Sequence, residues 1–214
     1  MIEELSRIWK EIENCPRSDC PLHPPRPLLL KPGRSVNVMV ITEGPNRPLE
    51  PGAIASLANH PTFTLLQAMF QGKFKPRSEQ ATAYWTHVRK CFLRDSQRNV
   101  SEEDKQKASR ICEEEYLEGE LKALRPRLVV AVGDHARKFF GRYDPELKRS
   151  GLLEVFRSCN PKPIPVDEFS FDLIILPHPS GRNAWWGDKL IEKDPDAPKR
   201  LEDLSNRILS ALES

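Results

Sequence analysis

Residues 36–42 read VNVMVIT, a largely apolar run bounded by Pro32-Gly33 before it and by Gly44-Pro45 after it. A strand that is buried on both faces of a parallel sheet has this composition, because helices cover both sides of such a sheet. We therefore predict that these residues form a central strand of a parallel α/β sheet.

Similar strand signals recur along the chain, at ATAYWTHV (residues 81–88), LVVAV (128–132) and FDLIIL (171–176), with residues 151–156 as a candidate for an additional strand. Helical periodicity is found between and around them, at residues 2–14, 62–70, 101–124, 133–140 and 198–212. Strands that alternate with helices predict a three-layer α/β/α sandwich with a mostly parallel four-stranded central sheet.

The composition is that of one globular domain. At 214 residues the chain is long enough for a full core, so we expect a single domain over residues 1–214, with an N-terminal helix and a cysteine-containing loop at residues 1–35. No run approaches the ~18 apolar residues that a membrane span needs. The acidic, amphipathic N-terminus differs from a secretory signal, so we expect a cytoplasmic protein with reduced thiols. The net charge of +2 argues neither for nor against nucleic acid.

Polar or glycine-rich loops follow the predicted strands, at TEGPN (residues 42–46), THVRKC (86–91), GDHA (133–136) and LPHPSGRN (176–183). In parallel sheets, functional groups gather in the loops beyond the carboxyl ends of the strands. We therefore expect the four loops to meet at one edge of the sheet and to form the functional site.

Four of the five cysteines fall in two distant parts of the chain: Cys15 and Cys20 near the N-terminus, and Cys91 and Cys112 in the middle. The residues alone leave three interpretations open, namely buried core cysteines, a zinc site, and a [4Fe–4S] cluster with four thiolate ligands. Zinc sites usually combine two short-spaced pairs, whereas Cys91 and Cys112 stand 21 residues apart. Cys159 is the odd one out, and we expect a buried or free thiol there.

The strand-end motifs, taken in order, resemble those of the uracil-DNA glycosylase superfamily. Thr42-Glu-Gly-Pro-Asn46 corresponds to the first motif, Thr86-His-Val-Arg-Lys-Cys91 to the second and His178-Pro-Ser180 to the last. Between them, Cys112 begins a helical stretch that leads to Gly133-Asp-His-Ala136. The chain is most similar to the iron–sulfur, family 4-like members, over nearly the whole domain.

This resemblance implies a DNA glycosylase of base-excision repair with a [4Fe–4S] cluster on Cys15, Cys20, Cys91 and Cys112. The cluster's expected role is structural, because it would attach the proline-rich N-terminal loop to the domain. The resemblance further implies damaged DNA as the partner, a monomer, and no contact with a membrane.

Two departures from the family pattern affect the base pocket. His87 replaces the asparagine that reads uracil in the second motif, and Thr42 and Asn46 replace the outer glycines of the first. A neutral histidine offers one donor and one acceptor, unlike the paired face of an amide. The resemblance implies excision of uracil, and the change to His87 adds hypoxanthine or xanthine as alternative substrates.

The resemblance also suggests the catalytic roles. His178 would donate a hydrogen bond to the leaving base, Glu43 would position or activate water and stabilise positive charge on the sugar, and His87 would bind the base edge. The alternatives are a capped loop histidine at His178 and a solvated carboxylate at Glu43.

The remaining site residues contact substrate or DNA. Those expected at the substrate are Gly44, Pro45, Asn46, Phe63 and Ser180; those expected at the DNA are Gly133, His135, Arg182 and Trp185. In this set Phe63 stacks under the base, the amides of residues 133–135 bind phosphate, and Arg182 enters the duplex with Trp185 or Trp186 beside it. Phe63 is otherwise a core residue, and the two tryptophans otherwise pack on the C-terminal helix.

Three alternatives stay open. Arg89, Lys90 and Arg94 form either a basic rim or an ordinary solvated face. The altered motifs also suit a non-catalytic iron–sulfur protein that binds nucleic acid or damage without cutting. A zinc-stabilised α/β protein with an unrelated small-molecule substrate is the third class.

Overall fold

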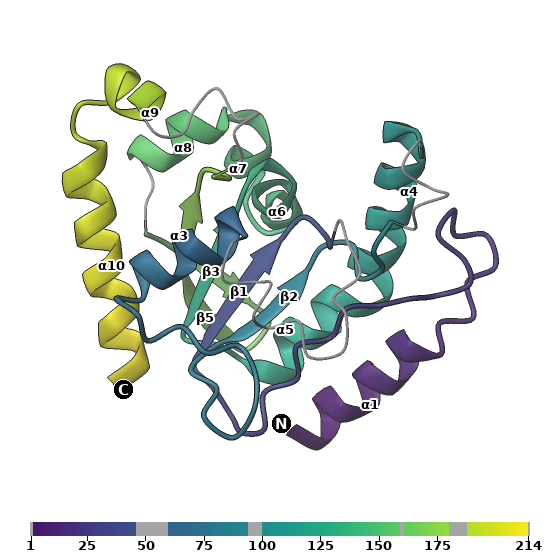
Figure 1. Ribbon diagram of the computed structural model, residues 1–214. Helices are drawn as coiled ribbons and strands as arrows, with labels where there is room; N and C mark the ends of the chain where they lie inside the picture. The colour runs from purple at the N-terminus through teal and green to yellow at the C-terminus, as the bar shows by residue number, and fades with distance from the viewer. Residues whose placement is uncertain (1, 46–59, 94–99, 159–160, 180–187, 214) are drawn as a thin grey trace.

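The computed structural model in Figure 1 describes residues 2–45, 60–93, 100–158, 161–179 and 188–213. Its centre is a five-stranded sheet with the order β2-β1-β3-β5-β4. The strands are β1 (Val38–Thr42), β2 (Tyr84–His87), β3 (Leu128–Val132), β4 (Lys162–Val166) and β5 (Phe169–Leu176). All neighbours pair in parallel except β4, which pairs antiparallel with β5. The predicted three-layer, mostly parallel α/β fold is confirmed.

The strand count differs from the prediction at one edge. β4 reads KPIPV, and its two prolines argue against a strand inside a sheet, but they are tolerated on an edge strand because that side donates no ladder bond. The extra strand predicted at residues 151–156 is wrong, since Leu152–Ser158 form helix α8. Short apolar runs of this kind do not distinguish a buried helix from a strand.

The helices lie on both sides of the sheet (Figure 1). Their bounds are α1 Ile2–Glu13, α3 Pro61–Met69, α4 Glu102–Cys112, α5 Glu118–Leu124, α6 Asp134–Phe139, α7 Pro145–Arg149, α9 Asp188–Lys193 and α10 Ala197–Glu213, with a π-helical turn at Glu113–Leu117 and a 3-10 turn at Phe140–Arg142. Within the described ranges, no helix has the length and apolar character that crossing a membrane requires.

Strand alternation divides the interior into two apolar cores. Met39 and Ile41 of β1 face the core that contains α1 and α5, whereas Val38 and Val40 face the core that contains α3 and α10. Figure 1 accordingly shows α1 and α10 on opposite sides of the sheet. Because successive side chains of a strand point to opposite faces, the residues of β2 are divided in the same way.

The parallel arrangement also determines where the functional loops lie. Thr42 at the end of β1 is in register with His87 at the end of β2, and Leu176 of β5 is in register with Val132 of β3. The loops after these strands therefore leave the sheet at the same edge, as the sequence predicts.

Candidate active site at the carboxyl edge of the sheet

The first motif is attached to the segment that follows β2. The amide of Val88 donates to the carbonyl of Thr42, and the amide of Arg89 donates to the carbonyl of Glu43, both at 2.8 Å. These bonds continue the parallel pairing past the ends of the strands. The Glu43 backbone is thereby held in place by the sheet itself.

The Glu43 side chain reaches into the region between the loops. Its carboxylate is 42% exposed, and Oε1 lies 3.9 Å from Nε2 of His135, at the start of α6. Gly44 beside it is partly buried, and Pro45 is buried. A half-exposed carboxylate at this edge is accessible to water and to a substrate.

The buried Arg89 side chain packs against this loop from inside the domain, a role that was not predicted from the sequence. Its side chain is 1% exposed, and its Nη1 donates to the carbonyl of Cys91 at 2.9 Å. A Cβ atom on Gly44 would lie 2.9 Å from Nη2, so the glycine allows the guanidinium to pack directly against the loop. Burial lowers the pKa of Arg89, and the nearby Glu43 carboxylate opposes that shift.

The predicted basic rim is therefore wrong for Arg89 and Lys90, which are both 1% exposed. The two positive charges lie inside the domain, where one supports the first motif and the other pairs with a buried carboxylate. Arg94 lies outside the described residues.

His178 follows β5 and is half-buried at the same edge. Its Nε2 lies 3.2 Å from Oγ1 of Thr62, in the first turn of α3. Burial lowers the pKa of His178, a charge on His60 lowers it further, and Glu43 opposes the shift. The ring is consequently neutral near pH 7.

Gly133 makes room for this histidine. Its φ of +91° is in the range that favours glycine, and an added Cβ would lie 3.3 Å from Cβ of His178. The Gly133 amide donates to the carbonyl of Leu176 at 2.8 Å, so this amide is used inside the fold rather than presented to a phosphate.

His87 is the most enclosed of the predicted catalytic residues. Its side chain lies on the α3 face of β2, only 4% exposed, with Nδ1 2.6 Å from Oγ1 of Thr42. Nε2 is buried and has no hydrogen-bond partner in the described part of the chain. Burial, followed by the charges of Lys90, Arg89 and His60, lowers the pKa of His87 to about 3.

Phe63 is next to Thr62 on α3 and is partly buried. Its ring is stacked near Trp85 at 6.4 Å between centroids and is tilted against Phe74 at 5.8 Å. It therefore contributes to the core and also retains accessible surface beside the residue that contacts His178. Asn46, Ser180, Arg182, Trp185 and Trp186 were also predicted at the site, and they lie outside the described residues.

The structure thus brings Glu43, His87 and His178 to one edge of one sheet, from the carboxyl ends of three different strands. A family model, that of the uracil DNA glycosylase superfamily, matches residues 31–205, most of the 214-residue chain. The chain belongs to the uracil DNA glycosylase superfamily. Comparison with the curated proteins found no match for this chain.

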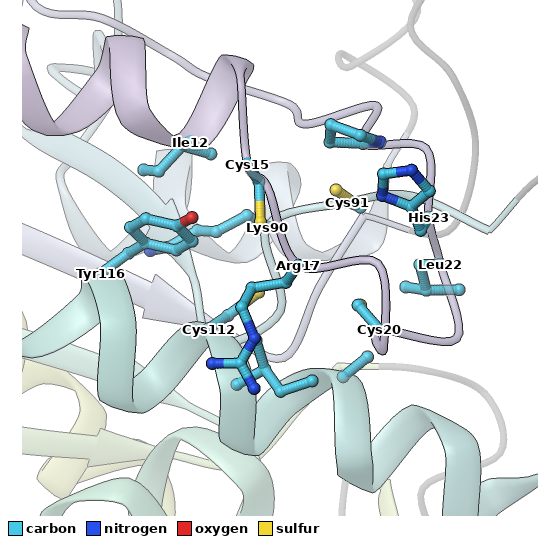
Figure 2. A pocket seen from close by; sticks show the side chains of 13 residues that line it. Ile12, Cys15, Arg17, Cys20, Leu22, His23, Lys90, Cys91, Cys112 and Tyr116 are labelled. Atoms are coloured by element: carbon cyan, nitrogen blue, oxygen red, sulfur yellow. The ribbon is translucent and has the colours of Figure 1, made fainter.

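This superfamily member has a second site, where the four predicted cysteine ligands line one pocket (Figure 2). Cys15 and Cys20 come from the loop after α1, Cys91 follows β2, and Cys112 is the last residue of α4. Cys15 and Cys20 precede the residues that match the superfamily, whereas Cys91 and Cys112 lie within them. The pocket therefore joins the N-terminal segment to the superfamily domain.

The backbone holds the two segments together beside this pocket. Leu28 donates its amide to the carbonyl of Lys90 at 3.0 Å, and Phe92 donates to Arg26 at 3.3 Å. Pro27 and Cys91 form an antiparallel bridge between these bonds. The loop around residues 26–28 thus runs alongside the chain that carries Cys91.

The Arg26 amide donates a hydrogen bond to Sγ of Cys91 at 3.3 Å. Such bonds stabilise thiolates and are a feature of iron–sulfur sites. Burial nevertheless raises the pKa of Cys91 to about 11 and that of Cys112 to about 12. Without a bound cation these thiols are protonated.

No group of three or more histidine, cysteine, aspartate or glutamate side chains within the described ranges is arranged to hold a metal ion. Figure 2 shows Cys15 and Cys20 on the loop after α1 and Cys112 on the helix, with Cys91 also lining the pocket.

Proposed function

We propose that this protein is a monofunctional DNA glycosylase that hydrolyses the N-glycosidic bond of a flipped, deaminated base. The observation that carries the proposal is the convergence of Glu43, His87 and His178 at the carboxyl edge of the sheet, in a chain of the uracil DNA glycosylase superfamily. Damaged DNA is the proposed substrate, with uracil as the first base to test and hypoxanthine and xanthine as the alternatives.

Glu43 acts on the sugar side of the bond. Cleavage leaves positive charge on the sugar, and a carboxylate close to that charge stabilises it or orients the attacking water. Its 42% exposure allows water to reach it, while the bond from Arg89 to its carbonyl fixes its backbone.

His178 acts on the base side. The base leaves as an anion, and a hydrogen-bond donor aimed at its oxygen stabilises that anion. Because the pKa of His178 is lowered, the ring is a neutral donor that has no full charge to neutralise before reaction. Thr62 on α3 helps to orient the ring through its hydroxyl at 3.2 Å.

We also propose that Cys15, Cys20, Cys91 and Cys112 hold a [4Fe–4S] cluster. Four thiols around one pocket suit a group that takes four thiolate ligands. When bound, the group supplies a cross-link between the N-terminal loop and the domain. Its role is structural, and no step at Glu43 or His178 depends on its electrons.

The test of the proposed activity is incubation of purified, iron-loaded protein with oligonucleotides that contain uracil, hypoxanthine or xanthine, followed by alkali. We expect strand breaks at one or more of these bases and none in undamaged DNA. If none is cut, the proposed activity fails. Tight binding to damaged DNA without abasic product would instead support a non-catalytic member, an alternative that the change to His87 favours.

A further inference from the structure

We infer that Thr42 fixes His87 in the tautomer that carries its proton on Nε2, so that the base pocket presents a single N–H donor and selects bases with an oxo oxygen. The inference rests on the proposed function and deepens it, because it specifies the substrate class. Thr42 is a positioning residue here, and His87 is the group that contacts the base.

The hydrogen bonds around Thr42 determine which atom donates. The indole Nε1 of Trp85 can only donate, and it lies 3.2 Å from Oγ1 of Thr42, so the hydroxyl oxygen accepts this bond. The hydroxyl proton is then available for Nδ1 of His87, which lies 2.6 Å away. A neutral ring that accepts at Nδ1 carries its proton on Nε2.

The opposite tautomer leaves two buried groups unsatisfied. If Nδ1 of His87 carried the proton, Oγ1 of Thr42 would accept hydrogen bonds from both Trp85 and His87. The hydroxyl proton of Thr42 would then have no acceptor in the described part of the chain. Nε2 would then be a buried acceptor that also lacks a partner. Thr42 is 5% exposed and His87 4%, so water does not readily satisfy either group.

The free Nε2 lies in the region of the other site residues. The rings of His87 and Trp85 lie 5.8 Å apart, and those of Trp85 and Phe63 lie 6.4 Å apart. Thr62, which precedes Phe63 on α3, contacts Nε2 of His178. The lowered pKa of His87 also keeps its ring neutral, with one N–H rather than two.

This donor distinguishes uracil from cytosine and hypoxanthine from adenine. Uracil carries an oxygen where cytosine carries an amino group, and hypoxanthine carries one where adenine carries an amino group. An N–H donor binds the oxygen but opposes the amino group, which is itself a donor. Because His87 offers no second polar atom to the base, the pocket reads this one oxygen in pyrimidines and purines alike.

The experiment compares the wild type with three variants: Thr42→Val, which removes the hydroxyl; Thr42→Ser, which keeps it; and Thr86→Val, which removes a buried hydroxyl from the other face of the sheet. The ring ¹⁵N shifts of His87 report the tautomer. The second measurement is the ratio of kcat/KM for uracil to kcat/KM for pyrimidin-2-one, which lacks the oxygen that distinguishes uracil from cytosine. This ratio reports how strongly the enzyme uses that oxygen. We expect the Nε2–H form in the wild type and in the Ser and Thr86 variants.

In Thr42→Val we expect the tautomer preference to be lost and the kcat/KM ratio to fall about tenfold, the effect of one hydrogen bond. A wild-type ring protonated on Nδ1, or an unchanged tautomer and ratio in Thr42→Val, would overturn the inference. If no base is excised at all, the proposed function fails, and the ¹⁵N shifts still decide the role of Thr42. The wild-type shifts and Thr42→Ser keep the test decisive even if Thr42→Val does not fold.

Discussion

At the scale of single residues, the two site histidines are both neutral but have different surroundings. His178 is half-buried beside Thr62 and Glu43, so it can exchange contacts with water and substrate. His87 is enclosed, and the positive charges of Lys90 and Arg89 add to its burial. The first suits a residue that acts on a leaving group, and the second suits a fixed element of recognition.

The proposed activity assigns catalytic roles to His178 and Glu43. For His178→Ala we expect kcat/KM to fall by about 10²–10³, which is typical of removing one donor to a developing anion. For Glu43→Gln we expect a loss of similar size with unchanged DNA binding. Single-turnover excision assays measure both effects. Glu103→Gln, a change at an exposed carboxylate on α4, is the matched control for Glu43→Gln. Full activity in His178→Ala would contradict the assigned role.

The lowered pKa of His87 makes stability depend on pH. The unfolded ring titrates near 6.5 and the folded ring at about 3, so below pH 6.5 the unfolded state binds the extra proton. The free energy of unfolding should therefore fall by about 2–3 kcal/mol between pH 6.5 and pH 4.5 because of this residue. Denaturant unfolding of the wild type and of His87→Gln at both pH values measures this change in unfolding free energy. An equally steep fall in the variant would show that other groups cause the loss.

At the scale of elements, β2 connects two buried polar networks on opposite faces of the sheet. On one face Trp85 and His87 bond to Thr42; on the other, Tyr84 and Thr86 bond to Glu120 of α5. Lys90 pairs with the same Glu120 at 2.5 Å and also lines the cysteine pocket. The strand thus links the surroundings of His87 to the cysteine pocket through packed elements.

The buried pair of Lys90 and Glu120 can be tested by breaking it and by replacing it. Glu120→Gln leaves the Lys90 ammonium buried without its counter-charge, so we expect a loss of about 3–5 kcal/mol in unfolding free energy. Replacing both residues by Met and Leu, which removes both charges, should recover part of that loss. Chemical denaturation of the three proteins measures the difference. If the double variant is the least stable, charge burial is not the cause.

At the scale of the whole molecule, the N-terminal segment is attached to the superfamily domain by packing and by the cysteine pocket. Leu5, Ile8 and Ile12 of α1 are buried in the core on the α5 face of the sheet. The backbone bonds of residues 26–28 hold the following loop against the chain after β2. A group bound by thiols from both segments would cross-link them.

Removal of one thiol should release that group. For Cys112→Ser we expect loss of bound iron, loss of absorbance near ~400 nm and a lower Tm. The matched control is Cys159→Ser, which should retain the iron content of the wild type. Iron analysis after anaerobic purification makes the measurement. Zinc without iron in the wild-type protein would contradict the cluster and favour the zinc alternative.

The sequence alone determined the layers of this protein and the edge where its candidate site lies. Apolar runs such as residues 36–42 and 128–132 are local signals, because burial on both faces requires apolar side chains at every position. The ordered motifs at the strand ends were likewise sufficient for the superfamily. The prolines of β4 argue against a strand, and the short apolar run of α8 argues for one, but the structure has the opposite in both cases. The edge position of β4 and the contacts of α8 arise only in the folded chain.

Only the tertiary structure decided the environments of the functional residues. Arg89 and Lys90 looked like a solvated basic run, yet both are buried, since their partners come from the chain around Cys91 and from α5. The free nitrogen of His87 depends on Thr42, which is 45 residues away in the sequence. Hydrogen-bond partners and burial are set by which segments meet in space, and residue type along the chain does not contain that information.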